Sequence, residues 1–153
     1  MKIRNDFVTN SSSSSFILGF KPGEDIGKTI YRKYQGEYVC EAISEVEKHV
    51  LPDDKAEDAV REALEDFVFC ELYDRIRKLC GKHGSVFNWM DENKEEYRQM
   101  KARLMEETCA GIMDGGYDRI SIVEWEDHTD IGSAMEHEVF PRLPCTILQI
   151  SHH

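Results

Sequence analysis

The amino-acid sequence predicts an α+β fold, with a small sheet formed by N- and C-terminal strands and covered by a layer of about three helices. Three observations lead to this prediction. Apolar residues alternate with other residues near the start, two β-rich runs lie in the last third, and the middle repeats apolar residues at helical spacing. Because the chain has 153 residues and shows neither an internal repeat nor a linker, we expect a single α+β domain over residues 1–153.

The first 20 residues are predicted to form two short strands around a serine-rich loop. The first strand is expected at residues 3–7. The second is indicated by Phe16, Leu18 and Phe20, which occupy alternate positions and therefore share one face of an extended segment. Residues 9–15 are expected to be the loop between them.

The middle of the chain is predicted to be helical. We expect helices at about residues 41–50, at about residues 54–80, and from Asn88 to the pair Gly115 and Gly116. The second helix is the clearest, because its apolar residues recur three and four positions apart and would form one buried face.

The last third should return to the sheet. Residues 119–125 are apolar on both faces when extended, which is typical of a central strand. A short helix is expected next, with Ser133 and Glu136 spaced as a capping box. Residues 145–150 are predicted to form the final strand.

Composition and charge exclude several classes of function. The net charge is -11, from 30 acidic and 19 basic residues, and such a surface repels nucleic-acid phosphates and anionic lipids. No apolar run approaches the roughly 18 residues of a membrane span, and no secretory signal opens the chain. Five cysteines without paired spacing indicate reduced thiols. We therefore expect a cytoplasmic protein that binds neither nucleic acid nor membrane.

The serine-rich loop has three interpretations. Its hydroxyls and backbone N–H groups suit an anion, but the glycines and lysine of a phosphate-binding loop are missing. A solvated connector is the simplest reading, and modification or recognition by another protein is the third. The residues concerned are Thr9, Asn10, Ser11, Ser12, Ser13, Ser14 and Ser15.

The opening of the chain also resembles a known signature. Its stretch DFVTNSSSSSF, within residues 1–17, is similar to the start of assorted uncharacterised bacterial proteins that differ afterwards. The resemblance covers about a ninth of the chain. It implies a bacterial source and a native serine run, and it favours a role in modification, recognition or assembly. It implies no catalytic residues.

The C-terminal end is rich in histidine and carboxylate, the donors used by zinc, iron, manganese and nickel sites. No HExxH motif is present, and a solvated acidic loop with surface histidines explains the same composition. The candidate ligands of a divalent transition metal are His128, His137, His152 and His153, with Asp127 or Glu138 as candidate base.

Two functional hypotheses follow. The favoured one is an interaction or assembly module whose serine-rich N-terminal loop is recognised by an unknown protein partner or altered by a modifying enzyme. The alternative is a metal-dependent hydrolase that uses the C-terminal histidine and carboxylate cluster to activate water. The sequence does not determine substrate, partner or oligomeric state.

Overall fold

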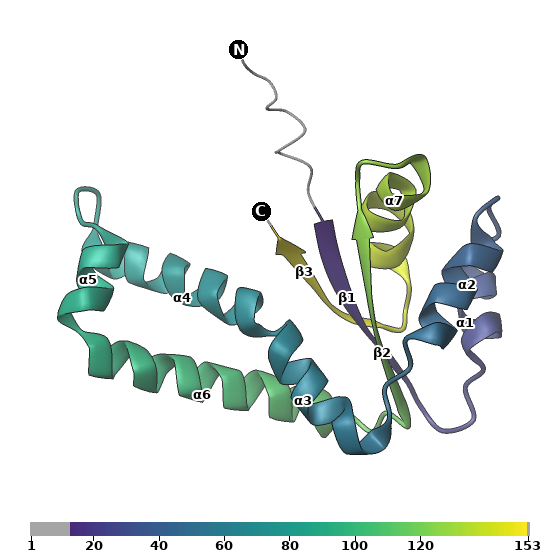
Figure 1. Cartoon of the computed structure of the whole chain (residues 1–153), viewed down its shortest axis with the longest axis horizontal. Helices are drawn as coiled ribbons and strands as arrows, with labels where there is room; N and C mark the ends of the chain where they lie inside the picture. Colours follow the sequence, from purple (N-terminus) through teal and green to yellow (C-terminus); the bar gives the residue numbers. More distant parts are fainter. Residues whose placement is uncertain (1–12, 153) are drawn as a thin grey trace, which may run out of the picture.

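The computed structural model describes residues 13–152 and confirms the α+β fold class. Its three-stranded antiparallel sheet is formed from the two ends of the described chain and from one strand between them (Figure 1). The strand expected at residues 3–7 lies outside the described residues. The elements are β1 (Ser13–Phe20), α1 (Ile26–Lys33), α2 (Val39–Lys48), α3 (Asp53–Ala63), α4 (Glu65–Cys80), α5 (Val86–Glu92), α6 (Lys94–Met113), β2 (Arg119–Glu126), α7 (Asp130–Ala134), the π-helical turn η2 (Met135–Val139), the 3-10 turn η3 (Phe140–Arg142) and β3 (Thr146–His152).

The central strand is β1, so the prediction that residues 119–125 form the central strand is wrong. The sheet order is β2-β1-β3, which places β2 at an edge. Its outer side is nevertheless covered, because Val50 forms a β-bridge with Ser121 and the Leu51 N–H donates to the Ile120 carbonyl at 2.9 Å. The apolar residues of this edge strand lie on both faces because both faces are buried: Val123 belongs to one core cluster and Ile120 to the other.

Helices pack on both faces of the sheet, whereas the sequence predicted a layer on one. Alternation along β1 sends Phe16 and Leu18 to one face and Ile17 to the other. The face of Phe16 packs against α1, α2 and the segment from Met135 to Cys145. The face of Ile17 packs against α3, α4 and α6, which correspond to the helices expected at about residues 54–80 and from Asn88. The helix expected at about residues 41–50 is α2, and it packs on the opposite face.

The helix boundaries differ from prediction at several points. Helix α1, capped by the Asp25 carboxylate, was not predicted. The long helix expected at residues 54–80 is divided at Leu64 into α3 and α4. The helix expected from Asn88 begins earlier, because Ser85 caps α5, and it breaks at Asn93, whose side-chain amide donates to the Trp89 carbonyl.

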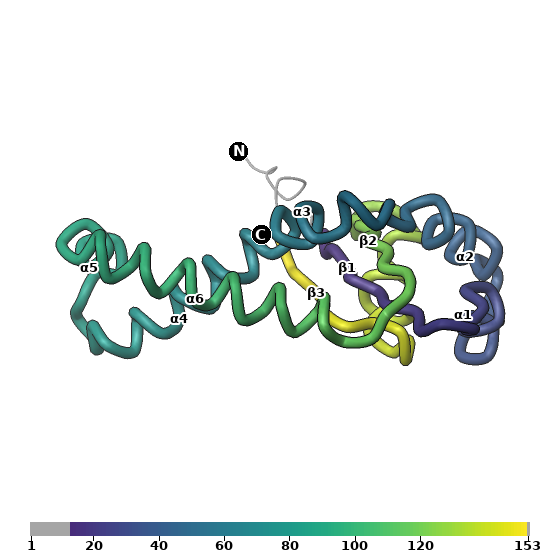
Figure 2. Tube along the Cα trace, turned by 90° about the horizontal axis from the view of Figure 1, so that it is seen from below, coloured from purple at the N-terminus to yellow at the C-terminus, as the bar shows by residue number. Residues whose placement is uncertain are grey.

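Helices α4, α5 and α6 form an arm that extends away from the sheet (Figures 1 and 2). Rings on α4 and α5 line one side of this arm. Tyr73 lies between Phe69 and Phe87, with centroid separations of 6.2 and 5.9 Å. We call these three residues the aromatic strip. Between residues 13 and 152, none of the helices combines the length and apolar character needed to cross a bilayer.

Candidate functional site

The last three serines of the run belong to strand β1, so their assignment to a loop is wrong. Ser13, Ser14 and Ser15 pair with residues of both β2 and β3. Polar residues are accepted here because the ladder satisfies the backbone and neighbouring side chains satisfy the hydroxyls. The remaining predicted loop residues, at positions 9–12, lie outside the described part of the chain.

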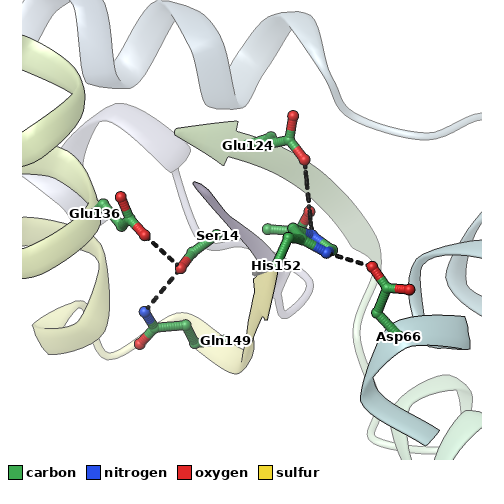
Figure 3. A network of polar contacts seen from close by, with 7 residues as sticks. Ser14, Asp66, Glu124, Glu136, Gln149 and His152 are labelled. Atoms are coloured by element: carbon green, nitrogen blue, oxygen red, sulfur yellow. Dashed lines mark hydrogen bonds and ion pairs between the residues drawn. The ribbon is translucent and has the colours of Figure 1, made fainter. Parts of the chain in front are cut away.

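Ser14 points to the face covered by α1, α2 and the turn η2. It is 1% exposed, donates a 2.8 Å hydrogen bond to Oε1 of Glu136 and accepts one of 3.3 Å from Gln149 (Figure 3). Glu136 is itself 3% exposed. It does not form the predicted capping box with Ser133. The cap of α7 is Thr129, whose hydroxyl accepts from the Gly132 N–H at 2.9 Å.

Ser15 points to the opposite face and meets His152. Its Oγ lies 2.8 Å from Nε2 of His152, and Nδ1 of the same ring lies 2.6 Å from Oδ2 of Asp66. A second carboxylate, Glu124, is 3.4 Å from the Ser15 hydroxyl and 3.7 Å from Nε2. Figure 3 shows the His152 ring between the carboxylates of Asp66 and Glu124. We call Ser15, His152 and Asp66 the Ser-His-Asp group.

One group of three side chains in the described part of the chain has the spacing to hold a metal ion. Asp127, Glu136 and His137 each offer one donor atom within 4.8 Å of the others. Nε2 of His137 lies 3.6 Å from Oδ2 of Asp127 and 3.7 Å from Oε2 of Glu136. Donors about 2.1 Å from a tetrahedral ion are separated by roughly 3.4 Å, so a small adjustment would bring all three to bonding distance.

The four histidines predicted as metal ligands do not form one site. His137 belongs to the three-donor group, while His152 belongs to the Ser-His-Asp group. His128 is half-exposed and lies 3.0 Å from Glu126, and His153 is outside the described residues. The two candidate bases differ as well. Asp127 stands beside His137 as a candidate ligand, and Glu138 is exposed.

The five cysteines are free thiols in different environments. Cys40 and Cys70 are exposed and Cys80 is partly exposed, whereas Cys109 and Cys145 are buried. Burial raises the pKa of the Cys145 thiol to about 11. Burial also raises the pKa of the Cys109 thiol, and the nearby Arg61 guanidinium opposes that increase. Neither buried thiol is therefore activated as a nucleophile.

Sequence reasoning missed Asp66 and Glu124, and it gave Glu136 a different role. Asp66 is 86 positions from His152, and Ser15 is 137 positions from it, so no local motif connects them. The serine run and the histidine-rich end were both singled out by composition. Their contact follows only from the pairing of the first and last described strands.

Comparison of the chain with models of protein families, with curated proteins and with solved structures finds no match.

Proposed function

We propose that the protein is an interaction or assembly module whose serine-rich N-terminal segment is recognised or modified by another protein. The observation that carries this proposal is the aromatic strip on the arm. Phe69 is 41% exposed and Phe87 is 59% exposed, and both rings contact Tyr73. Exposed apolar groups gathered on one surface are typical of protein contact sites.

A basic hollow beside the aromatic strip defines what the partner would meet. Arg77, Lys78 and Lys82 line a hollow beside Tyr73 and Phe87 at the end of the arm. Because the rest of the chain is strongly acidic, this local positive charge favours a partner segment with acidic and apolar side chains. We keep the expectation of a cytoplasmic protein without nucleic-acid binding as part of the proposal.

The hydrogen bonds of β1 limit which serines are available for modification. Ser14 lies against the Glu136 carboxylate and Ser15 lies near the Glu124 carboxylate, so the negative charge of a phosphate on either hydroxyl would be repelled. We therefore assign recognition or modification to Thr9, Asn10, Ser11 and Ser12, together with the partly exposed Ser13.

The test combines mass spectrometry with affinity capture from the native host. We expect either a modified peptide within residues 9–13, or a partner that is captured by the wild type and, once purified, rebinds it. Rebinding should be lost in the double variant Phe69→Ser/Phe87→Ser and kept in Tyr31→Ser, which alters a residue 52% exposed on α1. An unmodified N-terminus, with no partner that depends on the strip, contradicts the proposal.

The second candidate function is a metal-dependent hydrolase, favoured by one observation: the three-donor group of Asp127, Glu136 and His137. The ligand set differs from the four histidines first considered, since only His137 remains in it. Three protein ligands leave a coordination position for water, which a divalent ion such as Zn²⁺ would activate for hydrolysis.

Titration with zinc and manganese chlorides, followed calorimetrically, tests this candidate. We expect about one ion per chain and at least tenfold weaker binding in His137→Ala, because a ligand is lost. His128→Ala is the matched control, since both imidazoles are similarly exposed, at 54% and 53%. Equal binding by the two variants would exclude this site.

A further inference from the structure

The Ser-His-Asp group has the geometry of an activated nucleophile. Ser15 lies near the start of the central strand β1, His152 ends the neighbouring strand β3, and Asp66 lies in the first turn of α4. Ser15 and His152 share a face of the sheet, because Ser13, two positions before Ser15, is paired with His152.

The two ring nitrogens of His152 face the partners that such chemistry requires. An ionised carboxylate only accepts hydrogen bonds, so Asp66 favours the tautomer that carries the proton on Nδ1. In the neutral ring Nε2 is then an acceptor, directed at the Ser15 hydroxyl 2.8 Å away. The hydroxyl is the donor and the imidazole is the base that removes its proton.

Glu124 is the competing acceptor for the same hydroxyl. Its Oε2 is 3.4 Å from Ser15 Oγ, whereas Nε2 of His152 is 2.8 Å away. Hydrogen bonds between such groups are strongest below about 3 Å, so the imidazole is the principal partner. The 3.7 Å separation of Glu124 from Nε2 places its charge where it stabilises the imidazolium formed during proton transfer.

A hollow of about 360 Å³ gives access to the group and is lined by Ser15, Asp66, Glu124 and His152. Its remaining walls are small or apolar, with one further carboxylate, and consist of Leu51, Ala59, Ala63, Ile122 and Glu62. Its size admits a small molecule, and its carboxylates repel anions.

We propose that Ser15 is a nucleophile, activated by His152, that accepts acyl groups from small carboxylic esters without negative charge. Oγ of Ser15 bonds to the ester carbonyl carbon while Nε2 of His152 takes the hydroxyl proton. The tetrahedral intermediate expels the alkoxide, which leaves as an alcohol with the proton from His152, and an acyl-Ser15 ester remains. A water molecule, deprotonated by the same nitrogen, attacks the carbonyl carbon of this ester. The bond to Oγ breaks, the carboxylic acid leaves, and His152 returns the proton to Ser15. Asp66 is a positioning residue.

The position of Ser15 within the sheet limits the expected rates of acylation and deacylation. Ser15 is paired in register with Glu124 on one side and Ile150 on the other. Its backbone N–H therefore belongs to the ladder and is not free to stabilise the oxyanion of the tetrahedral intermediate. Loss of one oxyanion donor slows hydrolases by about 10²–10³. The proposal therefore predicts acylation by activated esters with slow release of the acyl group.

The test uses the full chain with p-nitrophenyl acetate as the probe, in a Cys40→Ser/Cys70→Ser background that removes the exposed thiols. We expect a burst of p-nitrophenolate of about one equivalent per chain, and peptide mass spectrometry that places the acetyl group on Ser15. Ser15→Ala should abolish the burst, and Ser151→Ala, at an exposed serine of β3, should keep it.

Two further variants keep Ser15 in place. His152→Gln should slow acylation of Ser15 at least a hundredfold, because the base that removes the hydroxyl proton is lost. Asp66→Asn should slow acylation at least tenfold and leave unchanged the ester concentration that gives half the maximal rate. Acetylation that spares Ser15, or acylation of Ser15 at an equal rate in His152→Gln, would overturn the proposal even where Ser15→Ala fails to fold.

Discussion

The Ser14 hydroxyl donates a 2.8 Å hydrogen bond to Oε1 of Glu136, a residue 122 positions further along the chain. Both partners are buried, at 1% and 3% exposure. The bond joins the central strand to the π-helical turn after α7. The adjacent Ser15 makes its contacts on the opposite face. Ser14 therefore connects the central strand directly to one helical layer, and Ser15 connects it to the other through His152 and Asp66.

Replacement of Ser14 by alanine should destabilise the fold. The buried Glu136 carboxylate loses a donor, and the expected cost is about 1–3 kcal/mol in the free energy of unfolding. Urea denaturation followed by circular dichroism measures it. Ser13→Ala, at the partly exposed neighbouring position, should change the value by less than about 0.5 kcal/mol. Equal effects from both variants would show that the bond does not contribute.

A pair of glycines tests the packing between α7 and the end of β2. A Cβ atom added to Gly132 would lie 1.8 Å from the Glu126 carbonyl oxygen, whereas one added to Gly111 on α6 meets nothing within 4 Å. Gly132→Ala should therefore cost about 1–3 kcal/mol or more. Gly111→Ala should stabilise the helix by about 0.5–1 kcal/mol. Thermal unfolding of the two variants should show shifts of opposite sign, and a neutral Gly132→Ala would contradict this packing.

Two leucines on α4 separate core packing from helix propensity. Leu72 is fully buried, whereas Leu79 is 66% exposed on the same helix. Leu72→Ala should lower the free energy of unfolding by about 2–5 kcal/mol, because it removes apolar contacts and leaves a cavity. Leu79→Ala should change it by less than about 0.5 kcal/mol. Urea titrations measure both, and similar losses would show that the arm is packed differently.

The thiols should differ in their reaction with a disulfide reagent at pH 8. Cys40 and Cys70 are exposed and should react rapidly, whereas Cys109 and Cys145 should react only after unfolding. With its pKa at about 11, Cys145 is ionised to only about one part in a thousand at this pH, and it is also shielded. Reaction of all five thiols at one rate in the native protein would be the contradictory result.

The same pKa makes stability fall at high pH. The folded state favours the neutral Cys145 thiol, because its pKa is raised from 9.0 to about 11. The neutral Cys145 thiol therefore makes its full contribution to the free energy of unfolding below pH 9, and this contribution is lost as the pH rises through 11. Unfolding measured between pH 8 and 11 should show a smaller loss in Cys145→Ala than in the wild type.

Several elements were accessible to sequence reasoning because local patterns encode them. Alternation at Phe16, Leu18 and Phe20 indicated a strand, and the β-rich run after Gly116 indicated another. Apolar spacing also located the helical middle. The break at Leu64 was not predictable, since apolar spacing continues through it. Helix α1 also carries a local signal, an acidic cap at Asp25 followed by Ile26 and Ile30.

By itself the sequence determined the fold class, the strand positions near both ends and the two unusual segments, because period, charge and composition are local properties. Only the tertiary structure decided which strand is central, and it placed Ser13–Ser15 inside the sheet. The pairing of β1 with β3 brings Ser15 beside His152, and the packing of α4 on that face adds Asp66. Contacts between residues about 86 and 137 positions apart depend on how whole elements pack, which no local pattern records.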